Sequence, residues 1–148
     1  DLARAMRPLA EHAPPADRTP AHGPLQPTPL MKAMLQPPGR WARFHQGMLW
    51  RLPPALPDAA LAQALQALLD HHDALRLAQT PSGMHILPAG AIDAKACLHT
   101  LADGAPDAWR RAHSAAAARL APAEGLNLQA VRLIGDRLLM VLHHAVVD

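Results

Sequence analysis

The run from Leu138 to Leu142 constrains the fold more than any other stretch of this sequence. It consists of five consecutive apolar residues, Leu-Leu-Met-Val-Leu, between Arg137 and His143. A continuous apolar run of this length is typical of a strand that is buried on both of its faces. The run therefore predicts a β-strand over Arg137–His143 in the interior of a sheet.

Two adjacent histidines follow this run, and Asp148 comes four residues after His144. Neighbouring side chains of a strand point to opposite faces. If the strand continues through the pair, one imidazole faces the packed interior and the other faces out of the sheet. Histidine is also the side chain best suited to proton transfer near neutral pH. The pattern therefore indicates one structural histidine and one imidazole that is free for acid–base chemistry.

The composition excludes several classes of protein. With 148 residues the chain can form one ordinary domain, and its core must come from Leu, Val, Ala and Met because aromatic residues make up only 3%. Fourteen basic and twelve acidic residues give a net charge of +2 without a Lys/Arg block, which argues against nucleic-acid binding. The single Cys97 excludes an internal disulfide and fits a reducing compartment. No membrane-spanning run or signal peptide is visible, so we expect a cytoplasmic protein.

The periodicity of the chain predicts the following elements. Helices are expected within Leu25–Leu35, with Pro29 in the first turn, and over Asp58–His72 and Pro106–Leu120. Strands are expected over Phe44–Leu52, Leu77–Thr80, Met84–Leu87, part of Ala94–Leu101 with Cys97, Leu126–Gly135 and Arg137–His143. Thr28 and Asp58 are expected to cap their helices, and His113 is expected to be solvated. Residues 1–22 have the composition of a linker, which is either a frayed terminus or the tail of an upstream domain.

The segment His143-His144-Ala-Val-Val-Asp148 resembles the HHxxxD core motif of the condensation-domain superfamily of nonribosomal peptide synthetases. This superfamily includes condensation, epimerization and cyclization domains. Thr28-Pro29-Leu30 resembles part of the opening P-L-T-P-I-Q motif, although Pro27 and Met31 replace the usual Leu and Gln. Phe44-His45-Gln46 resembles an F-N-Q segment, with His45 in place of Asn.

Two further segments favour the epimerization subtype. His71-His-Asp-Ala-Leu-Arg76-Leu77 resembles the second superfamily motif in the wording typical of epimerization domains, whereas condensation domains more often read RHEALRT. Gly125-Leu-Asn-Leu-Gln-Ala130 also resembles epimerization domains. The choice between epimerization and condensation rests only on the residues of these motifs, and both activities stay open.

The resemblance implies a fold class and a set of site residues. The expected fold is α+β, a two-layer α/β sandwich like chloramphenicol acetyltransferase, in which residues 23–148 form the N-terminal lobe of a V-shaped two-lobed domain. His144 is expected to be catalytic, with His143, Asp148 and Arg76 as structural support. Our hypothesis is that Arg76, rather than His71, pairs with Asp148 and fixes the loop that carries His144.

The resemblance also implies the chemistry and the partners. An epimerization domain removes and returns the Cα proton of an L-aminoacyl or peptidyl thioester, whereas a condensation domain joins two carrier-bound substrates. The substrate is carried on the 4′-phosphopantetheine arm of a carrier protein, so no directly bound cofactor is expected. Residues 1–22 are then either the tail of a preceding carrier protein or a frayed terminus. Without the second lobe, this chain is expected to be inactive and to expose an apolar surface where that lobe packs.

Two rival interpretations remain. The chain is either catalytic or a non-catalytic lobe that docks a carrier protein or a neighbouring synthetase domain. A metal site built from His143, His144 and Asp148 is disfavoured, because adjacent histidines on a strand point apart and no further close ligands follow.

Overall fold

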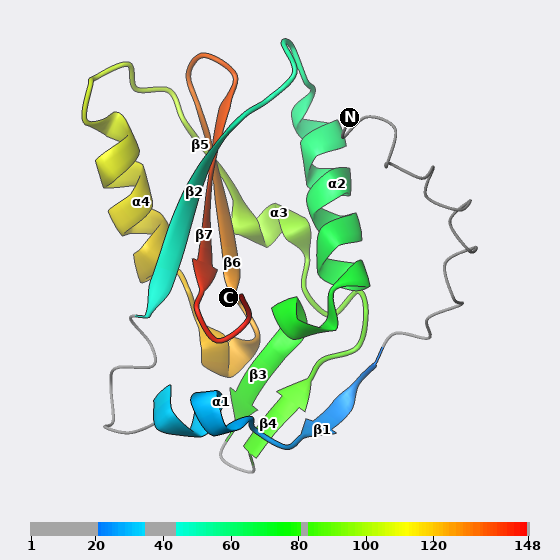
Figure 1. Ribbon diagram of the computed structural model, residues 1–148. Helices are drawn as coiled ribbons and strands as arrows, with labels where there is room; N and C mark the ends of the chain where they lie inside the picture. The colour runs from blue at the N-terminus through cyan, green and yellow to red at the C-terminus, as the bar shows by residue number, and fades with distance from the viewer. Residues whose placement is uncertain (1–20, 35–43, 81–82, 148) are drawn as a thin grey trace, which may run out of the picture.

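The computed structural model describes residues 21–34, 44–80 and 83–147, and Figure 1 shows how its elements are arranged. The helical elements are α1 (Pro29–Met34), α2 (Asp58–His71), η3 (Asp73–Arg76), α3 (Ala94–Cys97), α4 (Ala108–Ala118) and η4 (Pro122–Glu124). The strands are β1 (Gly23–Leu25), β2 (His45–Arg51), β3 (Leu77–Thr80), β4 (Gly83–Ile86), β5 (Leu98–Leu101), β6 (Leu128–Leu133) and β7 (Arg137–His143). Most of the predicted linker lies outside the described residues.

The described strands form two sheets. In the four-stranded sheet the order is β2-β7-β6-β5, with β2 and β6 antiparallel to β7 and with β5 parallel to β6. In the three-stranded sheet the order is β1-β4-β3, and both pairs are antiparallel. The predicted strand over Arg137–His143 is confirmed as β7, and it has a neighbouring strand on each side.

Helices cover both faces of the four-stranded sheet (Figure 1). On one face, α2 and α3 form a core with Leu138 and Leu142 of β7, and on the other face α4 forms a core with Leu139 and Val141. The prediction of a strand buried on both faces is therefore confirmed, as is the mixed α+β fold class. Helices pack on both sides of this sheet because a strand that is apolar on both faces must be covered on both.

The strands β6 and β7 form a hairpin. Leu133 pairs with Arg137, so the loop consists of the three residues Ile134, Gly135 and Asp136. Gly135 and Asp136 have φ angles of 77° and 52°. Glycine and aspartate tolerate this left-handed region better than most residues, so the sequence suits a loop with two such positions.

The first helix begins where the sequence pattern suggested, with Pro29 in its first turn. Leu25 belongs to β1, and α1 begins at Pro29. The amide of Met31 donates a hydrogen bond to Thr28 Oγ1 at 3.2 Å, which confirms the predicted cap. A proline suits the position of Pro29, because the first helical residues have no partner for their N–H groups within the helix.

Two other local predictions were wrong. Cys97 lies on the short helix α3 and not on a strand, because the side chain of Asp93 accepts a hydrogen bond from the Lys95 amide and starts a helical turn there. Asp58 is the first residue of α2 and makes no capping hydrogen bond. Its carboxylate instead accepts a hydrogen bond from Arg132 of β6 at 2.6 Å, which ties α2 to the sheet.

His113 of α4 was expected to be solvated, but it packs against the edge strand β2. A Cβ atom added to Gly47 would lie 2.6 Å from Cδ2 of His113, so the ring occupies the space that a larger residue would need. The centroid of the His45 ring lies 5.1 Å from that of His113. Burial lowers the pKa of His113, and the nearby His45 lowers it further. Gly47 therefore permits close contact between α4 and β2.

Candidate functional site

The two adjacent histidines lie where β7 ends, and their surroundings differ. His143 is the last residue of β7 and has no exposed surface. Its amide donates to the carbonyl of Asn127 at 2.8 Å, and its Nδ1 accepts a hydrogen bond from the amide of Ala145 at 3.3 Å. His144 begins the turn after the strand and is only half-buried. This matches the predicted division into one interior and one outward-facing histidine.

His144 is held by its backbone and by an aromatic contact. Its amide donates to the carbonyl of Phe44 at 2.8 Å, which continues the pairing of β2 and β7 beyond the last paired residues, His45 and His143. The rings of Phe44 and His144 meet edge to face, with centroids 4.5 Å apart and planes at 71°. Nδ1 of His144 is buried and has no hydrogen-bond partner among the described residues. Of the two ring nitrogens, Nε2 is therefore the one that is left for contact with another molecule.

Val146 anchors the turn that follows His144. Its amide donates to the carbonyl of His143 at 3.1 Å. Its side chain packs against the core beneath α2 and also against Leu77 and Met84 of the three-stranded sheet. Because a single side chain contacts both cores, the turn is fixed at the junction of the two sheets.

Arg76 lies in η3 and has no exposed surface. Each N–H of its guanidinium has an acceptor: Nε donates to Leu87 O at 2.9 Å, Nη1 to Leu69 O at 2.6 Å and Asp70 O at 2.8 Å, and Nη2 to Ala21 O at 3.4 Å and Asp73 Oδ1 at 2.7 Å. Two of these carbonyls belong to the last turn of α2, where carbonyl groups have no partner within the helix. The side chain therefore caps α2 and joins it to the segments before β1 and after β4.

Asp148 lies outside the described residues, so its pairing with Arg76 or His71 stays a prediction. In the described part of the chain the N–H groups of Arg76 already have the acceptors named above. A guanidinium has five N–H groups in a fixed geometry. The carboxylate of Asp148 would therefore have to share one of these N–H groups with an acceptor that the group already has.

Asn127 is a site residue to which the sequence analysis gave no role. It is almost fully buried, and its Nδ2 donates to the carbonyls of Leu75 and Leu77 at 3.3 and 2.6 Å. Its own carbonyl accepts the hydrogen bond from His143 described above. Asn127 therefore connects the segment around Arg76 to the end of β7. The sequence offered one sign of its importance, its place in the motif Gly125–Ala130. The motif did not show that Asn127 connects two distant segments of the chain.

Other candidate chemistries find little support in the described residues. No group of three or more His, Cys, Asp or Glu residues that could hold a metal is found among them. Burial raises the pKa of the Cys97 thiol to about 11, with a further contribution from Asp93, so the reactive thiolate is disfavoured. No helix in the described part of the chain is long and apolar enough to cross a membrane.

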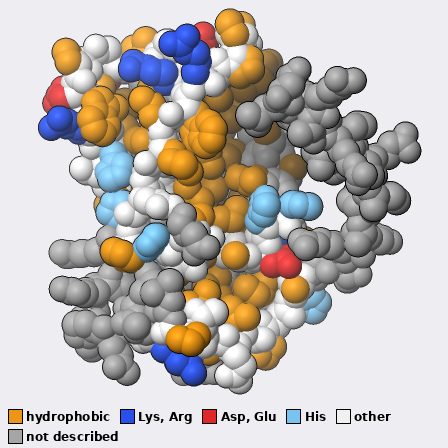
Figure 2. Space-filling model, in the orientation of Figure 1, with side chains coloured by type: hydrophobic (Ala, Val, Ile, Leu, Met, Phe, Trp, Pro, Cys, Tyr) orange, Lys and Arg blue, Asp and Glu red, His pale blue; other side chains and the backbone are white. Residues whose placement is uncertain are grey.

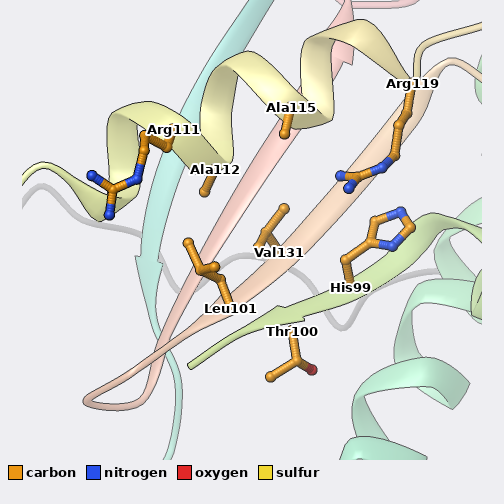
Figure 3. Close-up of a pocket in the computed structure, with 8 residues that line it drawn as sticks. All are labelled: His99, Thr100, Leu101, Arg111, Ala112, Ala115, Arg119 and Val131. Atoms are coloured by element: carbon orange, nitrogen blue, oxygen red, sulfur yellow. The ribbon is translucent and has the colours of Figure 1, made fainter. Parts of the chain in front are cut away.

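A cavity of about 180 Å³ lies between α4 and β5, and Figure 3 shows the side chains around it. Its lining residues are His99, Thr100, Leu101, Arg111, Ala112, Ala115, Arg119 and Val131. The Arg111 guanidinium is held by Asp103 and Asp107, and His99 Nε2 lies 2.9 Å from Oε1 of the buried Gln129. None of the predicted site residues lines this cavity.

Large apolar side chains are exposed on and beside the edge strand β2. Phe44, Met48, Leu49 and Trp50 are between 41% and 51% exposed. Figure 2 shows apolar side chains along the middle of this face of the molecule, over β2 and the elements beside it. Exposed apolar side chains gathered in this way mark a surface that another protein segment can cover. Phe44 belongs to this surface and also touches His144.

Comparison with solved structures identifies the fold. The chain is similar to the epimerization domain from the third module of tyrocidine synthetase B, with a TM-score of 0.67 and 18% identity over 84% of this chain. The chain therefore shares its fold with part of this epimerization domain. The mixed α+β fold matches about one lobe of such a domain, because the chain spans only 31% of the length of that epimerization domain.

Two other structures agree with this fold. A nonribosomal peptide synthetase bound to alpha-methyl-L-serine-AMP matches 91% of this chain at 24% identity with a TM-score of 0.57, and this chain spans 14% of its length. A structure concerned with condensation domain-mediated chain release from the enacyloxin polyketide synthase matches 90% of this chain at 24% identity with a TM-score of 0.53, and this chain spans 29% of its length. No protein-family model and no curated protein matches the sequence.

Proposed function

We propose that this chain is the N-terminal lobe of an epimerization domain of a nonribosomal peptide synthetase, with residues 23–148 forming the lobe. The observation that carries the proposal is the placement of His144. Its imidazole stands at the end of a strand that is buried on both faces, its backbone is tied to β2, and its Nδ1 is buried. Such support fixes the backbone that carries the imidazole, and the burial of Nδ1 leaves Nε2 for proton transfer.

The proposed reaction is the epimerization of a carrier-bound L-aminoacyl or peptidyl thioester. Nε2 of His144 takes the Cα proton, and the electron pair of the broken Cα–H bond passes into the thioester enolate. An acid on the second lobe returns a proton to the opposite face of Cα, which gives the D form. Atoms and charge balance without an oxidant or a bound cofactor, because the carrier protein's 4′-phosphopantetheine arm only delivers the substrate.

His143, Arg76 and Asp148 support His144 in this proposal. The buried His143 fixes the end of β7 through its bond to Asn127, and Asn127 in turn binds the segment that carries Arg76. The exposed apolar residues of β2 are proposed to pack against the second lobe. The isolated chain is then inactive, since it lacks the residue that returns the proton.

The alternative function is condensation, in which His144 orients an amine that attacks a thioester carbonyl. The similar structures include both an epimerization domain and a condensation domain, so the fold is compatible with either reaction. The wording of the motifs over His71–Leu77 and Gly125–Ala130 favours epimerization. A non-catalytic docking lobe is the third candidate, and it predicts that His144 can be replaced without loss of function.

The test uses the two-lobed protein that carries this chain, together with its carrier protein loaded with an L-aminoacyl or peptidyl thioester. After incubation in D₂O, the product is hydrolysed and its Cα deuterium content and chirality are measured. The variants are His144→Ala and, as a matched control, His72→Ala, which removes an exposed imidazole at the end of α2.

Deuterium uptake with a mixture of D and L products, lost in His144→Ala and kept in His72→Ala, supports an epimerase with His144 in the proton path. Peptide-bond formation with an acceptor carrier, without deuterium uptake, assigns the protein to condensation. If His144→Ala has the activity of the unchanged protein, the proposed role of His144 is wrong.

A further inference from the structure

Phe44 is the only phenylalanine in the chain, and its ring lies against His144. The ring centroids are 4.5 Å apart and the planes meet at 71°, which is the edge-to-face geometry that aromatic rings prefer. The same two residues are joined by the hydrogen bond from the His144 amide to the Phe44 carbonyl at 2.8 Å. Phe44 therefore contacts His144 through both its backbone and its side chain.

Among the described residues, no hydrogen bond is found that would set the orientation of the His144 imidazole. Its Nδ1 is buried without a partner among the described residues. The neighbouring His143 differs, because its Nδ1 accepts a hydrogen bond from the Ala145 amide. A catalytic histidine is commonly oriented by a hydrogen bond from its second ring nitrogen to another group. At His144, the orientation of the ring must therefore come from the side chains that pack against it.

We propose that Phe44 is the positioning residue for His144, and that its ring fixes the side-chain rotamer in which Nε2 faces the substrate. This inference rests on the proposed function of His144 and adds a specific residue to it. The backbone hydrogen bond fixes the Cα atom of His144 but leaves rotation about χ1 and χ2 free. The Phe44 ring restricts that rotation by occupying one side of the imidazole. A displacement of about 1 Å in a catalytic group can lower the rate about a hundredfold.

Phe44 also belongs to the exposed apolar surface on and beside β2. A variant of Phe44 could therefore lose activity because that surface is damaged and not because His144 is displaced, and a control has to distinguish the two effects. Trp50 provides the matched control, because it lies on β2, the strand that Phe44 directly precedes, and is 51% exposed, compared with 50% for Phe44. Both side chains are aromatic, and their even spacing along the strand places them on the same face. The structure records no ring contact between Trp50 and His144. Trp50→Leu therefore removes a comparable apolar side chain from the same surface.

The first measurement concerns the ring contact itself and needs no activity. The ¹H–¹³C spectrum of histidine-labelled protein is recorded, and the His144 ring signals are assigned by their loss in His144→Ala. Phe44→Leu is expected to shift the His144 signals, because it removes the ring current of a neighbouring aromatic ring, whereas Trp50→Leu leaves them in place. If Phe44→Leu leaves the His144 signals unshifted, the inference is overturned.

The second measurement compares kcat with KM for the carrier-bound thioester in the two-lobed protein. Phe44→Leu is expected to lower kcat about 10- to 100-fold with KM unchanged, and Phe44→Tyr, which keeps the ring, is expected to restore kcat to within about threefold. Trp50→Leu reports the loss of kcat that comes from the apolar surface alone, and the loss in Phe44→Leu should be clearly larger. Equal losses of kcat in the Phe44→Leu and Trp50→Leu variants would overturn positioning and assign Phe44 to the surface alone.

The two proposals fail in different ways. A fully active Phe44→Leu variant beside an inactive His144→Ala variant refutes positioning and leaves the proposed function in place. A fully active His144→Ala variant refutes the proposed function and the positioning role together.

Discussion

Replacement of Arg76 by alanine is expected to destabilise the fold severely. Arg76 has no exposed surface, and its guanidinium binds four backbone carbonyls and the Asp73 carboxylate. A hydrogen bond from a charged group contributes about 1.5–3 kcal/mol, and breaking a buried charged pair costs about 3–5 kcal/mol. The hydrogen-bond energies and the ion-pair energy overlap, so they cannot be added. The Asp73 side chain is also 38% exposed, so solvent weakens its ion pair with Arg76.

The carbonyls of Leu69 and Asp70 therefore account for much of the expected effect. Both carbonyls lie in the last turn of α2, where carbonyl groups have no partner within the helix. In Arg76→Ala they lose the hydrogen bonds that Nη1 of Arg76 donates to them. We expect the free energy of unfolding to fall by about 4 kcal/mol, which is a large part of the roughly 5–15 kcal/mol typical of a domain. Arg76→Lys should lose about 2 kcal/mol, because an ammonium keeps the charge but has three donors in place of five.

The assay is equilibrium unfolding in urea followed by far-UV circular dichroism, with the free energy obtained from the midpoint and slope. Arg111→Ala is the control, since Arg111 pairs with two carboxylates, those of Asp103 and Asp107, but has a side chain that is 52% exposed. Exposed ion pairs contribute little, so its midpoint should not change measurably. An Arg76→Ala midpoint equal to that of the unchanged protein would refute the capping role derived from the structure.

Three further predictions concern the contact between α4 and β2 and the single thiol. Gly47→Ala should destabilise the protein by about 1–3 kcal/mol in urea unfolding, because the new Cβ meets the His113 ring at 2.6 Å, whereas Gly104→Ala meets no atom closer than 3.9 Å and should be tolerated. Since burial and His45 lower the pKa of His113 below 6.5, the unfolded chain binds a proton more readily, so stability should decline as the pH falls below about 6.5, and His113→Gln should flatten that decline. Cys97 is fully buried with a pKa of about 11, so iodoacetamide should label it only after unfolding, and rapid labelling of the native protein would contradict that burial.

Local patterns in the sequence predicted the elements whose burial follows a simple period. The apolar run before His143 predicted β7 correctly because a strand buried on both faces has no polar alternation to obscure it. The Leu spacing of α2 likewise predicted a helix that buries Leu61, Leu65 and Leu69. The alternation of strand side chains predicted the different burial of His143 and His144.

The remaining features depend on contacts between distant parts of the chain. The packing of His113 over Gly47 arises where α4 crosses β2, and no local pattern contains that distance. Arg76 was expected to have a structural role, but its acceptors come from Ala21, the end of α2 and Leu87, which are brought together only by the fold. The contact between Phe44 and His144 depends on the register of β2 and β7 in the same way.

That register also determines the order in which the site can form during folding. β6 and β7 are joined by a short hairpin loop, whereas β2 and β7 come from opposite ends of the described chain. Closing a long loop costs more entropy, so the hairpin is expected to form first and β2 to dock later. A slip of β2 by one residue would turn Phe44 away from His144 and place His45 on its face. The surroundings of His144 are therefore expected to form after the hairpin, when β2 docks on β7 in its correct register.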